Sequence, residues 1–180
     1  LYRPYILALC LFPTLAQAES ATVARVLDGV ILPGFAELQR STQTLSDAAQ
    51  ADCRANSPAL QEAYNAAFDA WIAVETYRAG PLETKGQGLA IAFWPDLKAA
   101  TPKALTALLA AKTQQSVDFA ENSIAARGLF ALEAMLYDPA FNGYGLTDPG
   151  CPLTQAIAAD LAQTALAVNA QWKGEFAPLM

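Results

Sequence analysis

The chain of 180 residues contains no histidine at any position. Histidine is the commonest metal ligand and a frequent general base, and it activates the nucleophile in Ser-His and Cys-His pairs. Its absence excludes those pairs and any zinc centre built on imidazole ligands. Sustained alternation of apolar and polar residues, which is typical of strands, is also missing, and helical spacing of apolar residues predominates.

Positive charge is scarce, because eleven Lys and Arg stand against seventeen Asp and Glu and give a formal net charge of −6. This balance argues against nucleic acid or anionic lipid as a partner. Beyond the first residues, the sequence has no apolar run that approaches membrane-spanning length. Cations, cationic peptides and uncharged molecules remain compatible with this charge as partners.

Residues 1–18 resemble a secretory signal peptide. Arg3 precedes a short apolar run, and Ala-Gln-Ala at 16–18 is a small-x-small cleavage site. The run is interrupted by Pro13 and is too short to span a bilayer. We therefore expect an exported protein with one mature domain at 19–180. The alternative interpretation is a buried N-terminal helix.

Two cysteines remain in the mature chain, Cys53 and Cys151. An even number in an oxidising compartment favours a disulfide. Such a bond would close a loop of roughly 100 residues and contribute about 4–5 kcal/mol in the chain-entropy model. Two unrelated free thiols are the alternative.

The spacing of apolar residues predicts five helices, and proline and glycine mark their ends. Pro33-Gly34 is expected to kink or split the first helix. The loops at 80–97 and 139–152 are of intermediate length, which indicates an all-α, antiparallel up-and-down bundle. The helices are expected at about 20–54, 58–79, 102–112, 116–137 and 153–173.

Two glutamates fall on apolar helical faces. At 100° per residue, the neighbours of Glu133 within about 60° on either side are apolar or aromatic. Glu75 lies among Tyr64, Phe68 and Trp71 in the same way, with Arg78 one turn along as a pairing partner. A carboxylate in a core costs several kcal/mol unless it is paired, hydrogen-bonded or protonated, so each glutamate needs a partner.

Three explanations remain open for Glu133. It could join a buried network of salt bridges and hydrogen bonds, it could bind a ligand or cation, or its face could be covered by a second domain. All three predict that Glu133 is shielded from water in the intact protein. Its partner would come from Arg78, from Trp94 or Tyr77, from a backbone amide, or from a metal or ligand.

At these residues the sequence resembles the imelysin family of exported bacterial proteins. Residues 127–133, Arg-Gly-Leu-Phe-Ala-Leu-Glu, align with the family motif Gly-x-His-x-x-Glu. Gly128 and Glu133 match the motif, whereas Phe130 replaces its histidine. Further similar segments occur in the family's order, namely Ile31-Leu32-Pro33, WIAVETYRAGP at 71–81, Phe93-Trp94-Pro95, and Cys151, Asp160 and Trp172 in the last helix.

The resemblance implies that 19–180 is the first of two related helical bundles, the N-terminal half of a longer protein in the periplasm or on the outer membrane, and it implies a link to iron uptake. We expect a non-catalytic, imelysin-like protein that binds a metal, a metal complex or a partner near Glu133. Carboxylate ligands at Glu133 and Glu75 would suit iron or calcium. The expected ligand-binding residues are Glu133, Glu75, Arg78, Trp94, Phe130, Gly128 and Trp71.

Two other functions are carried as alternatives, a metallopeptidase of the imelysin type (peptidase M75) and a structural module that docks a partner. Hydrolysis at zinc normally takes three protein ligands and an activated water. Because Phe130 removes the motif's imidazole, no catalytic residue is assigned and peptidase activity is not the expected function.

Overall fold

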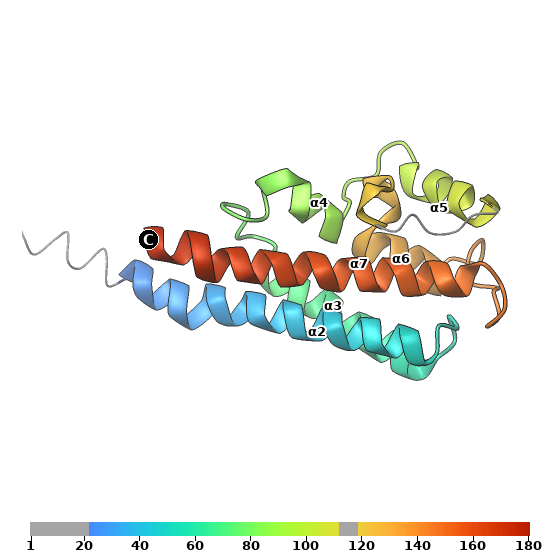
Figure 1. Cartoon of the computed structure of the whole chain (residues 1–180), viewed down its shortest axis with the longest axis horizontal. Coiled ribbons are helices and arrows are strands. Elements are labelled where there is room, and N and C mark those ends of the chain that lie inside the picture. The colour runs from blue at the N-terminus through green and yellow to red at the C-terminus, as the bar shows by residue number, and fades with distance from the viewer. Residues whose placement is uncertain (1–21, 112–118) are drawn as a thin grey trace, which may run out of the picture.

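The computed structural model describes residues 22–111 and 119–180, and its regular structure in these ranges is helical throughout (Figure 1). The expected all-α fold is confirmed. Among the described helices, none is long and apolar enough to cross a membrane. The signal peptide expected at 1–18 lies outside the described residues.

Three long helices form the body of the bundle, α2 (Leu32–Ala51), α3 (Pro58–Val74) and α7 (Gly150–Gln171). Helix α2 packs against both α3 and α7, and α6 (Gly128–Tyr137) packs on α7. Figure 1 shows α2 and α7 side by side along the length of the molecule, running in opposite directions. Both helices contribute fully buried apolar side chains, namely Phe35, Leu38, Leu45, Ile157 and Leu161, and the amides of Gln155 and Asn169 donate hydrogen bonds from α7 to α2.

The first helix is continuous from residue 22 to residue 51 and is not split at Pro33-Gly34. A π-helical turn, Leu27–Ile31, lies just before Pro33, and this change of hydrogen-bond pattern lets the helix continue past a residue that has no N–H to donate. A Cβ atom at Gly34 would lie 2.6 Å from Cγ1 of Val74. Glycine at this place therefore lets the end of α3 approach α2 closely.

Shorter elements cover one side of α6 and α7 in Figure 1. They include α4 (Gln87–Ile91) inside the segment expected to be a loop, and α5 (Ala100–Ala110), which matches the expected helix at 102–112. Three short 3-10 turns complete this layer, Thr84–Gly86, Phe119–Glu121 and Ile124–Ala126.

The helix expected at 116–137 begins only at Gly128 within the described residues. Arg127 has extended backbone angles, φ −113° and ψ 160°, and Gly128 has φ +72°, so a right-handed helix cannot run through this point. The angular positions assigned to residues before 128 therefore do not apply.

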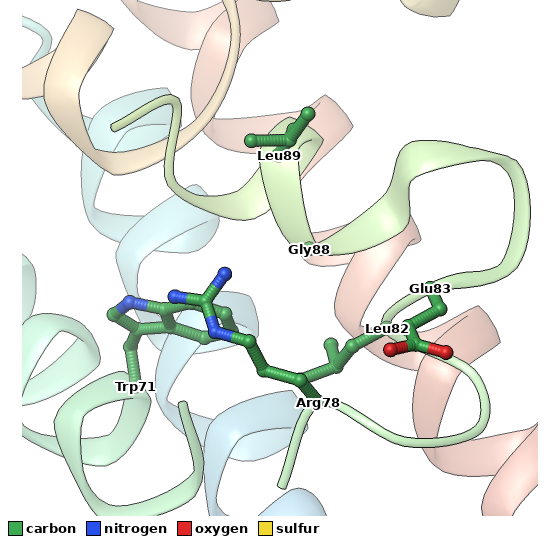
Figure 2. Close-up of a pocket in the computed structure, with 6 residues that line it drawn as sticks. All are labelled: Trp71, Arg78, Leu82, Glu83, Gly88 and Leu89. Carbon is green, nitrogen blue, oxygen red and sulfur yellow. The ribbon is translucent and has the colours of Figure 1, made fainter. Parts of the chain in front are cut away.

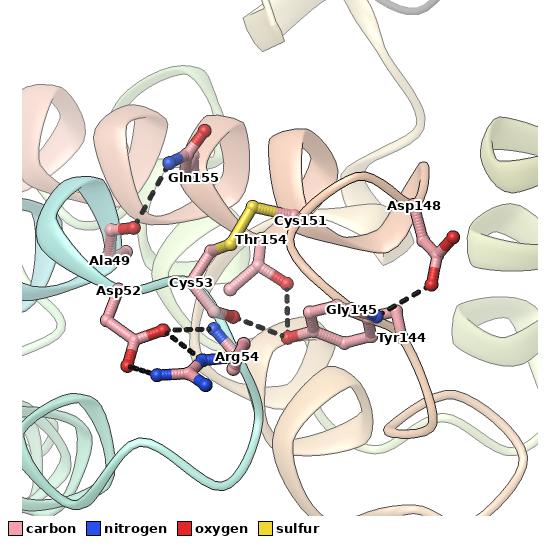
Figure 3. The surroundings of a disulfide bond; sticks show 10 residues. All are labelled: Ala49, Asp52, Cys53, Arg54, Tyr144, Gly145, Asp148, Cys151, Thr154 and Gln155. Atoms are coloured by element: carbon pink, nitrogen blue, oxygen red, sulfur yellow. Dashed lines mark hydrogen bonds and ion pairs between the residues drawn. A yellow bond between two sulfur atoms is a disulfide. The ribbon is translucent and has the colours of Figure 1, made fainter.

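The disulfide between Cys53 and Cys151 is present and confirms the pairing expected from the cysteine count (Figure 3). It joins the segment after α2 to the start of α7, with a Cα–Cα distance of 5.2 Å. The hydroxyl of Tyr144 lies 3.0 Å from the Cys53 carbonyl oxygen and 2.8 Å from Oγ1 of Thr154. Covalent and hydrogen bonds thus hold this end of the bundle together.

Candidate functional site

Gly128, the first residue of α6, packs against the C-terminal end of α4. A Cβ atom at this position would lie 2.2 Å from the Ile91 carbonyl oxygen and 2.3 Å from that of Ala90. Only glycine combines this close backbone approach with the positive φ of +72°. The first residue of the motif Gly-x-His-x-x-Glu therefore has a structural role, since it allows the end of α4 to touch the start of α6.

An ion pair that the sequence did not suggest fixes α6 on α7. Nε of Arg127 donates to Oδ2 of Asp160 at 2.8 Å, and Nη2 donates to Oδ1 at 3.0 Å. The side chains are only 13% and 6% exposed. Nη1 of Arg127 also donates to the carbonyl of Ala120 at 3.2 Å. Asp160 lies 33 residues away on another helix, so helical periodicity could not reveal the pair.

Glu133 is exposed in this structure, so the described residues do not supply the shielding that the sequence predicts for the intact protein. The buried side of α6 carries Leu129, Leu132, Met135 and Leu136, and its centre is turned about 100° from Glu133 at 100° per residue. Water can therefore solvate the carboxylate, and the cost of burying a charge does not arise.

The outward side of α6 joins a line of aromatic side chains from three segments, which we call the aromatic row. Phe130 and Tyr137 come from α6, Phe68 and Tyr64 from α3, and Trp94 from the segment after α4. Trp94 is 67% exposed at one end and Tyr137 is 41% exposed at the other. The ring centroids are separated by 5.5 Å for Trp94–Phe130, 6.0 Å for Phe130–Phe68, 6.1 Å for Phe68–Tyr64 and 5.7 Å for Tyr64–Tyr137.

The charge of Glu133 acts on the tyrosines of this row. Burial raises the pKa of Tyr64 well above its usual range, and the negative charge of Glu133 raises it further. The pKa of Tyr137 is raised by the same two causes, burial first and Glu133 second. A carboxylate thus lies within electrostatic reach of both phenols, on a face that is otherwise aromatic.

Glu75 and Arg78 do not form the ion pair expected from helical spacing. Helix α3 ends at Val74 and Glu75 is its half-buried C-cap, so Arg78 is not one helical turn along. Instead, the Arg78 side chain extends toward the indole of Trp71 (Figure 2). Both line a cavity of about 180 Å³ together with Leu82, Glu83, Gly88 and Leu89.

The ring contacts also set the register between α3 and α6. Tyr64 meets Tyr137 and Phe68 meets Phe130, so Glu133 lies level with the α3 segment between Tyr64 and Phe68. Glu75 is seven residues beyond Phe68, which is about 10 Å further along at 1.5 Å per residue. Among the described residues, no group of three or more Cys, Asp and Glu side chains is placed to hold a metal ion.

The family model of imelysin matches residues 31–180. The chain belongs to the imelysin family. Its fold is similar to the crystal structure of an imelysin-like protein from Psychrobacter arcticum 273-4, with a TM-score of 0.76 and 21% sequence identity. The match covers 93% of this chain and 53% of the other, so this chain spans about half the length of that protein. No curated protein matches the sequence.

Within this imelysin fold, five of the seven residues expected at the site separate into two groups. Phe130, Trp94 and Glu133 belong to the exposed face of the aromatic row, whereas Trp71 and Arg78 line the cavity. Gly128 packs against the end of α4 and Glu75 is the C-cap of α3, so neither joins these groups. Helical periodicity places Phe68, Tyr64 and Tyr137 on apolar faces and does not assign them to the site. The sequence shows their spacing along each helix, but it does not show that α3 and α6 contact each other.

Proposed function

We propose that this imelysin-family chain is a non-catalytic protein of the periplasm that takes part in iron uptake, and that its ligand or partner binds the face around Glu133. The observation that carries the proposal is the aromatic row, which is exposed at both ends and has one solvated carboxylate beside it. Large exposed apolar patches mark interaction sites, and we expect the exposed rings of Trp94 and Tyr137 to belong to one. The location and the iron link rest on the expected signal peptide and on the family resemblance.

The chemistry of the available side chains supports binding over hydrolysis. The whole chain lacks histidine, and Phe130 occupies the position of the motif's imidazole. A hydrolytic zinc centre needs three protein ligands and an open position for water. Within the described residues, the carboxylates and cysteines are not grouped in a way that could supply them.

The small number of available ligand atoms also favours a metal complex over a bare metal ion as the ligand. Calcium takes six to eight oxygen ligands, and Glu133 alone supplies at most two. Glu75 lies about 10 Å beyond Phe68 along α3, and Glu133 lies level with the segment before Phe68. A bare iron or calcium ion shared by the two carboxylates is therefore the weaker form of the proposal. An iron that arrives with its own ligands needs only a docking surface.

Titration with a six-coordinate ferric trihydroxamate, the ferric complex of desferrioxamine B, tests the proposal by calorimetry. We expect binding that is weakened at least fivefold by Glu133→Gln. Glu62→Gln is the matched control, because Glu62 is an exposed carboxylate on α3 outside the aromatic row. Absence of binding at millimolar complex, or equal affinity of both variants, would contradict an iron-complex role.

A second candidate function is docking of a second helical bundle on the same face. The observations that favour it are the 53% coverage of the Psychrobacter protein and the 67% exposure of Trp94. Trp71 and Trp172 are 3% and 1% exposed, so acrylamide quenching of fluorescence reports on Trp94. In a chain extended by a second bundle, quenching should fall to the level of buried tryptophan, and unchanged quenching would reject docking there.

A further inference from the structure

Glu133 lies in one stripe with two of the rings of the aromatic row. Phe130, Glu133 and Tyr137 are spaced i, i+3 and i+7 on α6, which places them on the same side of the helix. Tyr64 of α3 packs edge-on against Tyr137. The carboxylate is therefore flanked by ring systems from two helices.

No cation of the described residues neutralises this carboxylate. Among the described residues, the ion pairs join Arg40 to Glu37, Arg54 to Asp52 and Arg127 to Asp160. None of these pairs includes Glu133. The nearest arginine in sequence, Arg127, is committed to Asp160 through two hydrogen bonds. The net charge of −6 for the whole chain further favours the approach of a positive ligand.

The rings add a second attraction for positive charge. The face of an aromatic ring carries partial negative charge and attracts an ammonium group within about 6 Å of its centroid, and tryptophan is the strongest such partner. Trp94, with 67% of its surface exposed, and the half-buried Phe130 have centroids 5.5 Å apart. Because Phe130 lies one turn from Glu133 and its ring contacts Trp94, we expect a cation on the exposed surface of Trp94 to lie near the side of α6 that bears Glu133.

We propose that the face formed by Glu133, Phe130 and Trp94 binds an alkylammonium group of a small ligand. This inference rests on the proposed function, because it specifies what the same face recognises. Rings and one carboxylate suit an ammonium group, which carries a single positive charge and N–H donors for one carboxylate, whereas they offer too few oxygen ligands for a bare metal ion. A positive group also offsets the charge of Glu133 when the ligand covers it, which an apolar ligand cannot do.

Fluorescence titration with n-butylammonium chloride, at ionic strength held constant with sodium chloride, tests the inference. We expect a saturable change in the emission of Trp94 in the millimolar range, weakened about 2- to 5-fold by Glu133→Gln. Trp94→Leu should weaken binding by a similar factor in calorimetry, and it should leave folding intact because that side chain is exposed. Glu62→Gln should leave the affinity unchanged.

Two ferric complexes separate this inference from the proposed function. The ferric complex of desferrioxamine B carries a free ammonium group, and its N-acetylated form does not. Tighter binding of the ammonium form, lost in Glu133→Gln, supports both. Equal binding of the two complexes overturns the ammonium inference and leaves the iron role standing. Binding of butylammonium without either complex overturns the iron role alone, and a response equal to that of sodium chloride overturns the inference.

Discussion

Asp160→Asn is expected to destabilise the bundle markedly, because it leaves a mostly buried guanidinium without its counter-charge. Arg127 and Asp160 are 13% and 6% exposed and share two hydrogen bonds of 2.8 and 3.0 Å. Removing one partner of a buried ion pair typically costs about 3–5 kcal/mol, since the remaining charge stays desolvated.

The structure places the expected loss near the lower end of that range. After the substitution, Arg127 still donates to the Ala120 carbonyl oxygen at 3.2 Å and is 3.4 Å from Oγ1 of Thr164. These contacts hold part of the guanidinium, so we expect a loss of about 3 kcal/mol. For a domain of this size that corresponds to a fall in Tm of roughly 6–12 °C.

Urea and thermal unfolding followed by circular dichroism measure this loss. The control is Arg40→Gln, which breaks a pair whose side chains are 69% and 46% exposed and should cost less than about 1 kcal/mol. Replacing both Arg127 and Asp160 by apolar residues of similar volume should recover most of the stability. If Asp160→Asn costs no more than the control, the ion pair does not hold α6 on α7.

Three further predictions concern stability. Gly128→Ala should cost about 3 kcal/mol or more in urea unfolding, because its Cβ would meet the Ile91 carbonyl oxygen at 2.2 Å in a left-handed backbone. Serine at both Cys53 and Cys151 should cost about 4–5 kcal/mol, a difference that dithiothreitol added to the native chain removes. Burial raises the pKa of Tyr64. The contribution of this tyrosine to the free energy of unfolding is therefore complete below about pH 10 and is lost at higher pH. Tyr64→Phe should therefore reduce the loss of stability at alkaline pH.

The sequence predicted the features that depend on local spacing or on counting. The period of apolar residues indicated helices, and an even number of cysteines indicated the disulfide. Helix ends were less accurate where long-range packing decides them. The sequence predicts that the second helix continues to residue 79, yet α3 stops at Val74, where the close approach of Gly34 brings α2 and α3 together.

The position of Glu133 was missed for a related physical reason. Helix α6 is apolar on most of its circumference, so its hydrophobic pattern alone does not say which direction faces the core. Packing against α7, fixed by Arg127 and Asp160, turns Leu132 and Met135 inward. Glu133 then points to the side with fewer neighbours. Local periodicity could not have given this rotation, because a contact 33 residues away sets it.

The residue at position 130 distinguishes metal coordination from the binding of an organic cation. A histidine at this position would lie one turn from Glu133 and give the pair a nitrogen and an oxygen ligand for a metal. Phenylalanine supplies no ligand atom, but its ring packs between Trp94 and Phe68 and extends the aromatic row past the carboxylate. The same position on α6 thus loses the capacity to coordinate a metal and gains a surface that attracts organic cations. Phe130→His should reverse this exchange, with weaker binding of butylammonium and stronger binding of zinc.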